Sequence, residues 1–229
     1  QSSPGVDADL LCLGPELRSE ITMIQLYVDL DRTLFQTNLF DTNKWSLLHQ
    51  WFPWVEPSEQ QRQTCYYVED SESGLHYYDF DAHLAQLGLE PAVVYRRLRQ
   101  SVLADGRLEY PGTKELIHWA SAHTQLTVLT YGAAKYQQLK VALCPSLERV
   151  PVVVVQRPKG EFFQSQLAHA ERWLVDDKPI GGQLPPGVRF IQSTTYNGIA
   201  STSTARWPVV QSLADLPQQL VMLAQIKGM

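Results

Sequence analysis

Two aspartates and a threonine follow the first apolar stretch of the chain with the spacing D-x-D-x-T. The apolar and β-prone side chains of residues 21–28 predict a buried parallel strand, and Asp29, Asp31 and Thr33 follow it directly. A strand that ends in carboxylates places them at the carboxyl edge of a sheet, where open α/β folds bind ligands. Carboxylates there can act as a nucleophile or as ligands of Mg²⁺.

Polar side chains also follow later apolar strands. Thr130 follows the apolar residues 126–129, Lys159 opens a predicted helix, and Asp176 and Asp177 follow residues 173–175. If these strands are parallel, all of these side chains converge on one edge of the sheet. The sequence therefore predicts one site built from several strand ends.

This set of residue types suits phosphoryl transfer. A carboxylate nucleophile can form an aspartyl phosphate and so divide hydrolysis into two steps. The transferred group spreads negative charge over its oxygens, so catalysis depends mostly on positioning and on charge neutralisation. Mg²⁺ suits acids from two strands, and a lysine with a threonine hydroxyl can hold the remaining phosphate oxygens.

The order of these motifs resembles the haloacid dehalogenase-like (HAD) phosphohydrolase superfamily. The likeness covers about residues 21–195 and includes P-G-T-K-E-L-I before L-T-V-L-T, and K-G-E-F-F before W-L-V-D-D. The family pattern G-D-x-x-x-D is replaced by V-D-D-K-P, with Ile180 where the later acid would fall. This departure leaves open whether Asp177 touches the metal.

The resemblance implies a role for each motif residue. Asp29 would be the nucleophile, and Asp31 the general acid that protonates the leaving alcohol and then the base that activates water. Thr130 and Lys159 would hold the phosphoryl group. The resemblance also implies the metal ligands. Asp176 and Asp29 would bind Mg²⁺ together with the backbone carbonyl of Asp31, and Asp177 would support them.

Each residue taken singly also has a plain structural interpretation. An isolated D-x-D is commonly a cap or turn, Thr130 a strand-end hydroxyl and Lys159 a solvated charge; Lys135 and Lys178 are rival lysines. The order of the motifs favours the site, and it also excludes a two-component receiver domain, in which the lysine comes last.

Dehalogenation would not need Asp31, and phosphonate cleavage would need a Schiff-base lysine in the insert, where Lys44 is the only lysine. A binding or scaffold protein that has lost turnover remains the alternative from another class.

The rest of the chain predicts an α/β architecture. Short apolar strands alternate with helices, which indicates a Rossmann-like parallel sheet with helices on both faces. Residues 35–109 differ: they are rich in aromatic residues and predict a hairpin at 64–69 and 74–80, and helices at 82–87 and 91–103. After this insert we expect helices at 113–122, 133–143, 161–170 and 216–226, and strands at 126–129, 152–155, 173–175 and 188–191.

We therefore divide the chain into an N-terminal extension (1–20), a catalytic core (21–34 and 110–229) and a cap insertion (35–109). The insert leaves and rejoins the core near the predicted site, so we expect it to cover that site and to set selectivity. We also expect the sheet to fold without it. The identity of the substrate, the oligomeric state and the role of the extension stay open.

The composition of the chain limits the kinds of partner and environment that we expect. The formal net charge of -5 argues against non-specific nucleic-acid binding, which needs a basic face. No apolar run reaches the roughly 18 residues that span a membrane. Three scattered cysteines and six histidines without ligand spacing favour neither a disulfide framework nor a zinc site. We expect a cytoplasmic protein that acts on a small phosphorylated substrate.

Overall fold

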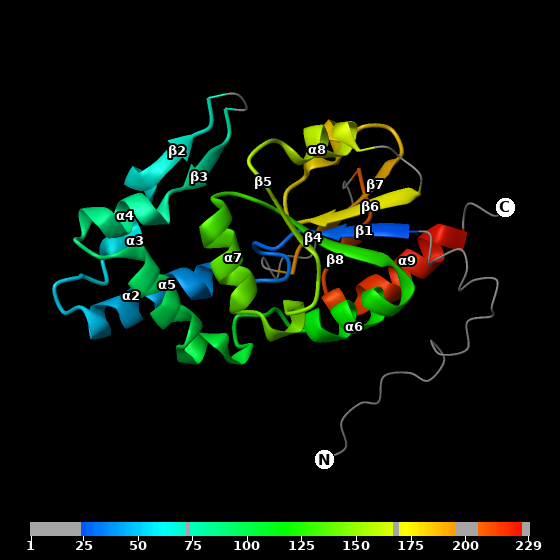
Figure 1. The fold of residues 1–229 in the computed structure, drawn as a ribbon. Helices are drawn as coiled ribbons and strands as arrows, with labels where there is room; N and C mark the ends of the chain where they lie inside the picture. The colour runs from blue at the N-terminus through cyan, green and yellow to red at the C-terminus, as the bar shows by residue number, and fades with distance from the viewer. Residues whose placement is uncertain (1–23, 72–73, 167–169, 196–205, 226–229) are drawn as a thin grey trace, which may run out of the picture.

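A six-stranded parallel sheet forms the centre of the molecule in a computed structural model that describes residues 24–71, 74–166, 170–195 and 206–225. The strand order is β5-β4-β1-β6-β7-β8, and every neighbouring pair is parallel (Figure 1). The strands are β1 (Ile24–Val28), β4 (Gln125–Tyr131), β5 (Val152–Val155), β6 (Glu171–Asp176), β7 (Val188–Ser193) and β8 (Val209–Val210). This confirms the predicted α/β fold class.

Helices cover both faces of the sheet. On one face lie α6 (Thr113–His123) and α9 (Leu216–Gln225), and on the opposite face lies α8 (Lys159–Ser165) (Figure 1). The alternation along β1 explains this: Leu26 and Val28 are buried in the main core, while Tyr27 packs edge-on against Phe163 of α8 at 4.9 Å between ring centroids. A strand covered on both sides needs apolar character on both faces.

The order in which the chain adds strands to the sheet switches from one side of β1 to the other, so a topological switch point lies between β1 and β6. The chain runs from β1 to β4 and β5 on one side and then crosses to β6 on the other side of β1. Such a switch point leaves a crevice at the carboxyl ends of the strands, because the two connections turn away from each other.

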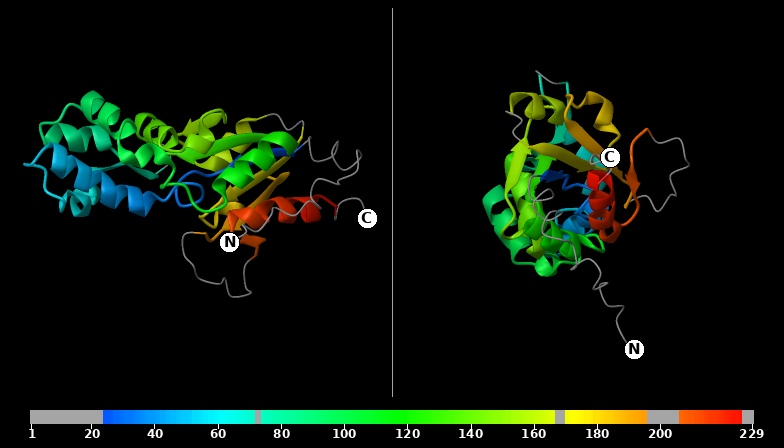
Figure 2. Two further views of the ribbon diagram at one scale, coloured as in Figure 1. Left: turned by 90° about the horizontal axis from the view of Figure 1, so that it is seen from below. Right: turned by 90° about the vertical axis from the view of Figure 1, so that its right-hand side faces the viewer.

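Residues between β1 and α6 form a helical part beyond the carboxyl ends of the strands. Its elements are α2 (Thr37–Trp51), α3 (Glu59–Arg62), α4 (Phe80–Gln86), α5 (Pro91–Arg99) and a hairpin of β2 (Tyr67–Glu69) with β3 (His76–Tyr78). Viewed from below the sheet, this part extends from one end of the molecule (Figure 2, left).

Several predicted elements in this helical part differ from the structure. The long helix α2 had no counterpart among the predicted elements, because its apolar residues do not form a clean stripe. Residues 64–66 belong to a 3-10 helix (Gln63–Tyr66) rather than to the predicted strand, and the helix predicted at 91–103 ends at Arg99. A second 3-10 turn (Val102–Asp105) follows, capped by Ser101, whose hydroxyl accepts a hydrogen bond from the Leu103 amide.

Elements of the core agree more closely with the sequence. Helix α6, helix α7 (Ala134–Ala142) and strand β5 lie where they were predicted, within a residue at each end. Strand β4 is longer than predicted, β8 was not predicted, and α8 begins earlier, at Lys159. The N-terminal extension and the last predicted helical residue, 226, lie outside the described residues.

One hydrophobic core joins the helical part to the sheet. Phe40, Trp45 and Leu98 of the helical part belong to the same buried cluster as Leu26 of β1 and Leu139 of α7, and α5 packs on α7. Removing residues 35–109 would uncover the apolar side of α7, which costs stability in proportion to the apolar area exposed. The expectation that the sheet folds without the insert stays a prediction, and the shared core argues against it.

Among the described residues, no helix has the length and apolar character needed to cross a bilayer. Cys65 is exposed and Cys144 buried, and both are free thiols.

Candidate active site

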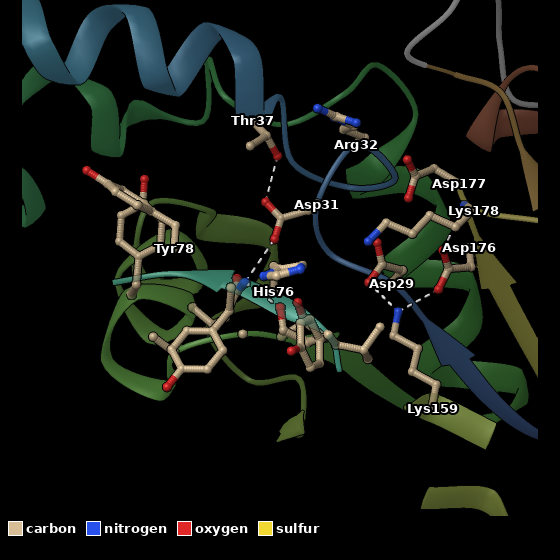
Figure 3. A pocket seen from close by; sticks show the side chains of 18 of the residues that line it. Asp29, Asp31, Arg32, Thr37, His76, Tyr78, Lys159, Asp176, Asp177 and Lys178 are labelled. Carbon is tan, nitrogen blue, oxygen red and sulfur yellow. Dashed lines mark hydrogen bonds and ion pairs between the residues drawn. The ribbon is translucent and has the colours of Figure 1, made fainter. Parts of the chain in front are cut away.

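A cavity of about 520 Å³ lies at the carboxyl ends of the strands. Its floor carries Asp29, Thr130, Lys159, Asp176 and Asp177, and its walls come from the helical part and α7 (Figure 3). This volume falls within the range of small-molecule sites. All six predicted site residues, Asp31 among them, thus line one cavity.

Strand register brings Asp29 and Asp176 together. Val28 of β1 pairs with Val175 of β6, so the residues that follow them lie side by side at the carboxyl ends of the two strands. Both carboxylates are buried, and both accept hydrogen bonds from the Lys159 ammonium, at 2.6 Å for Asp176 (Figure 3). The predicted lysine therefore contacts the predicted nucleophile.

The position of Lys159 depends on the glycine after it. A Cβ on Gly160 would lie 2.4 Å from the backbone oxygen of Gln183, so only glycine lets the start of α8 approach this loop. Of the rival lysines, Lys135 bonds Asp81 on the exposed side of α7, and Lys178 lines the cavity, whereas Lys159 is the lysine that bonds Asp29.

Three buried carboxylates gather at one point. Oxygens of Asp29, Asp176 and Asp177 all lie within 4.8 Å of one another. Burial raises the pKa of Asp29, with Lys159 opposing the shift and the neighbouring acids adding to it. Burial and the nearby Asp176 likewise raise the pKa of Asp177 to about 6.

This donor set fits a hard divalent cation. Buried carboxylates that repel one another are stabilised by a positive ion, and Mg²⁺ prefers a few carboxylates supplemented by water and phosphate oxygens. Lys159 supplies only one positive charge for the three acids. Burial lowers the pKa of Lys159, but the nearby Asp176 and Asp29 outweigh this effect and raise the pKa overall. The Lys159 ammonium therefore remains protonated.

Asp31 is held apart from that cluster. Its Oδ1 accepts hydrogen bonds from the Thr37 hydroxyl at 2.6 Å and the Lys140 ammonium at 2.7 Å, and its Oδ2 accepts one from Gln137 at 3.0 Å (Figure 3 shows the Thr37 bond). Burial raises the pKa of Asp31, but the charge and hydrogen bond of Lys140 outweigh this effect and lower it overall. The side chain of Asp31 is therefore outside the metal-compatible group, and the predicted role of its backbone carbonyl stays a prediction.

Thr130 offers an unused hydroxyl. Its Oγ1 is buried and has no hydrogen-bond partner within the described part of the chain. An unpaired buried hydroxyl is costly unless a ligand completes it. Thr130 lines the cavity, so a phosphate oxygen is a suitable partner.

Gly132, two residues later, makes room for the side chain that supports Asp31. Its φ is +143°, and a Cβ there would lie 2.7 Å from the Gln137 amide nitrogen. Gln137 also bonds the Tyr131 carbonyl, which fixes its amide toward Asp31.

The supporting residues Thr37, Gln137 and Lys140 were missed by the sequence interpretation. Gln137 and Lys140 are three positions apart, so they share a face of α7. That spacing was the available signal, but polar residues three apart on a helix usually mark a solvated face.

The outer wall of the cavity is aromatic and comes from the hairpin. Tyr67, His76 and Tyr78 line it, together with Asp41 of α2. Tyr78 is fixed from behind: its hydroxyl donates to His83 Nδ1, since His83 Nε2 donates to the Glu59 carboxylate at 2.9 Å. Lys44, the lysine considered for Schiff-base chemistry, is fully buried.

Several solved structures share the fold of this chain. No protein-family model matches the sequence, and no curated protein matches it either. Among solved structures, an L-2-haloacid dehalogenase is similar over 87% of this chain and 99% of its own, with a TM-score of 0.63 and 16% identity.

Two further structures have the same architecture. The HAD-hydrolase YfnB of Bacillus subtilis, bound to magnesium, matches 87% of this chain and 99% of its own (TM-score 0.54, 18% identity). CbbY of Rhodobacter sphaeroides, in complex with xylulose-(1,5)bisphosphate, matches 84% of this chain and 95% of its own (TM-score 0.51, 15% identity). At these identities the likeness establishes the fold, and it does so over nearly the whole of each chain.

Proposed function

We propose that this chain, which has the fold of the HAD-like hydrolases, is a Mg²⁺-dependent phosphomonoester hydrolase that works through an aspartyl phosphate on Asp29. One observation carries the proposal: Lys159 bridges Asp29 and Asp176 beside a third buried acid, while Asp31 is held a short distance away by its own donors. One carboxylate is thereby set up for attack and the other for proton transfer.

In the first step, an oxygen of Asp29 attacks phosphorus and the bond to the leaving alcohol oxygen breaks. Lys159 and the free hydroxyl of Thr130 receive the phosphoryl oxygens. The leaving oxygen takes a proton from Asp31. Because Lys140 lowers the pKa of Asp31, that proton must arrive with the substrate, whose negative charge raises the pKa of the nearby carboxyl.

In the second step, Asp31 is ionised and accepts a proton from water. The water oxygen attacks phosphorus, the bond to Asp29 breaks, inorganic phosphate leaves, and Asp31 then releases the proton to solvent. The hydrogen bonds from Thr37, Gln137 and Lys140 suit this half of the reaction, since they stabilise the charged base in a fixed orientation.

Asp29, Asp176 and Asp177 would hold Mg²⁺, which neutralises phosphoryl charge when bound. We propose a small phosphorylated compound as the substrate and the cytoplasm as the compartment. The alternative from another class is a binding or scaffold protein with this fold and little turnover.

The test is a hydrolysis panel. An aryl phosphate, an alkyl phosphate and a 2-haloacid are each assayed with Mg²⁺ and with excess chelator. Release of phosphate that needs both Mg²⁺ and Asp29 supports the proposal. Halide release that is independent of metal would instead assign dehalogenation, which the likeness to the L-2-haloacid dehalogenase makes worth including. Binding of phosphate esters without turnover would favour the scaffold.

A further inference from the structure

A buried lysine lies behind the wall of the cavity, away from the catalytic carboxylates. Lys44 of α2 is fully buried, and its ammonium donates to the Tyr136 hydroxyl at 2.6 Å and to Asp41 Oδ1 at 2.8 Å. Five aromatic rings surround it, with centroids 4.9 to 5.2 Å away: Phe40, Trp45, Tyr78, Phe80 and Tyr136. Burial lowers the pKa of Lys44 to about 8, with Asp41 opposing the shift, so the cation predominates at neutral pH.

Stability alone does not account for this cluster. Burying a charge is costly even when it is paired, and apolar residues of similar volume are often equally stable in such places. Ring contacts with a cation recover only part of that cost. What the cluster does achieve is the orientation of one carboxylate, that of Asp41.

Asp41 lines the cavity and is held through one of its two carboxylate oxygens. Its Oδ1 accepts three hydrogen bonds, from Lys44, from the Tyr136 hydroxyl at 3.2 Å and from Gln63 at 3.3 Å. Its Oδ2 has no hydrogen-bond partner in the described ranges, and the side chain is 21% exposed where it lines the cavity. A carboxylate fixed by one oxygen is a directed acceptor for a donor on a ligand.

The position of Asp41 relates it to the leaving group. It lies four residues after Thr37 on α2, so both face the same side of that helix. Thr37 bonds Asp31, the residue that faces the leaving oxygen in the proposed reaction. The cavity wall thus runs from the site of proton transfer to the free oxygen of Asp41.

The charges around Asp41 determine whether its Oδ2 suits a neutral or a cationic hydrogen-bond donor. Lys44 already neutralises Asp41, and Lys140 neutralises Asp31. Arg32 and Lys178 line the same cavity. A cationic amine would therefore meet no net negative charge at Asp41, whereas a neutral hydroxyl meets a charge-assisted acceptor without repulsion.

We propose that Asp41, oriented by Lys44, is a specificity-determining residue that accepts a hydrogen bond from a neutral hydroxyl on the leaving group. The preferred substrates are then phosphate monoesters of polyhydroxylated alcohols. This inference rests on the proposed phosphatase function. The rings of Tyr67 and Tyr78 suit the same class, because the C–H surface of a polyol can pack against them while its hydroxyls reach Asp41.

Matched substrates test the proposal. Glycerol phosphate is compared with n-propyl phosphate, ribitol 5-phosphate with n-pentyl phosphate, and 5-aminopentyl phosphate serves as the cationic arm. The chain lengths match within each set, so hydroxyl groups and charge are the main differences. We expect at least one polyol ester to exceed its alkyl partner by about tenfold or more in kcat/KM, the size of one hydrogen bond to a charged group. The aminoalkyl ester should show no such advantage.

Two variants separate the acceptor from its support. Replacing Asp41 alone would leave Lys44 buried and unpaired, so the double variant Asp41→Leu/Lys44→Met removes the pair together. In it the polyol-to-alkyl ratio should fall to within about threefold of unity, since the hydrogen bond is lost. Lys44→Met alone leaves the Asp41 charge unneutralised, so the aminoalkyl ester should gain relative to the alkyl ester. Glu56→Ala, an exposed acid in the same helical part, is the control.

Binding keeps the two proposals distinguishable. The same ligands are titrated calorimetrically into the Asp29→Asn protein with Mg²⁺ present. A polyol preference in binding without turnover by the wild type would reject the phosphatase function and keep the assignment of Asp41. Equal binding and equal turnover within each pair would overturn the assignment, as would a polyol preference that survives in Asp41→Leu/Lys44→Met.

Discussion

The floor and the outer wall of the cavity are built in different ways. On the floor, Asp29, Lys159 and Asp176 are buried, come from strand ends or the helix start after a strand, and contact one another directly. On the wall, Tyr67 is 52% exposed, and its hairpin forms a separate two-stranded sheet among the residues that the structure describes. The floor is fixed by strand register, whereas the wall depends on packing between helices and a hairpin.

Under the proposed function, this difference would separate the residues of the chemical step from those that select the substrate. Residues fixed by register cannot move without disturbing the sheet, which is what a nucleophile and its counter-charges need. A wall made of side chains on a hairpin can change without altering the register. We therefore expect substitutions on the floor to abolish turnover and substitutions on the wall to alter the ranking of substrates.

The two regions nevertheless share one hydrophobic core. The helical part shares its hydrophobic cluster with the sheet, so deleting residues 35–109 would test stability rather than selectivity. Single substitutions test the comparison more sharply, and the largest effect is expected on the floor.

Asp29→Asn should lower kcat with an aryl phosphate by more than about 1000-fold, because an amide is a far poorer nucleophile than a carboxylate. The change is nearly isosteric, so circular dichroism should remain that of the wild type. Asp215→Asn, on the exposed side of the molecule, is the matched control. Activity of Asp29→Asn within tenfold of the wild type would reject the nucleophile.

Removing the metal or one of its ligands should have the next largest effect. Asp176→Ala should raise the Mg²⁺ concentration for half-maximal activity by about 100-fold or abolish activity, because carboxylates are the main protein ligands of Mg²⁺. Ca²⁺ should support little turnover, since it is larger and accepts irregular coordination. Full activity in excess chelator would remove the metal from the mechanism.

Mg²⁺ affinity should also depend on pH. The folded-state pKa of Asp177 is raised to about 6, so this carboxyl takes up a proton as the pH falls through that value and then competes with the ion. Calorimetry should show weaker Mg²⁺ binding at pH 5 than at pH 7.5. In Asp177→Asn that difference should shrink, and an unchanged difference would place Asp177 away from the ion.

Lys140→Met tests the boundary between floor and wall. Lys140 lowers the pKa of Asp31, so removing it should raise that pKa. Where hydrolysis of the phospho-enzyme limits kcat, the acidic limb of the pH profile should move to higher pH by about one unit, with up to about a tenfold loss at pH values on that limb. Lys135→Met, on the same helix but bonded to Asp81, should leave the profile unchanged. An equal loss at every pH would indicate a merely structural role for Lys140.

Tyr67→Ala should have the smallest effect. Its ring lines the cavity from an exposed strand, so its loss should raise KM for a bulky phosphate ester about three- to tenfold and leave kcat with a small aryl phosphate within about twofold. Val68→Ala, the next residue, points to the other side of the hairpin and should change neither. A loss of kcat in Tyr67→Ala would show that the wall also takes part in the chemistry.

The sequence by itself determined the sheet, except for strand β8, and the residues at its edge. Asp29, Thr130 and Asp176 could be located because each follows an apolar strand, and parallel strands end at the same edge whatever surrounds them. Lys159 could be located because it opens the helix before the last acidic strand. Local patterns of this kind carry the topology, so the fold class and the floor of the cavity followed from them.

Only the tertiary structure decided which helical residues complete the site. Lys140 lies 109 positions from Asp31, and Tyr136 lies 92 positions from Lys44. Periodicity shows which residues share a helix face, but the distance and orientation between two helices depend on packing across the whole core. For that reason the support of Asp31, the orientation of Asp41 and the shared core of the two regions could not be read from the chain alone.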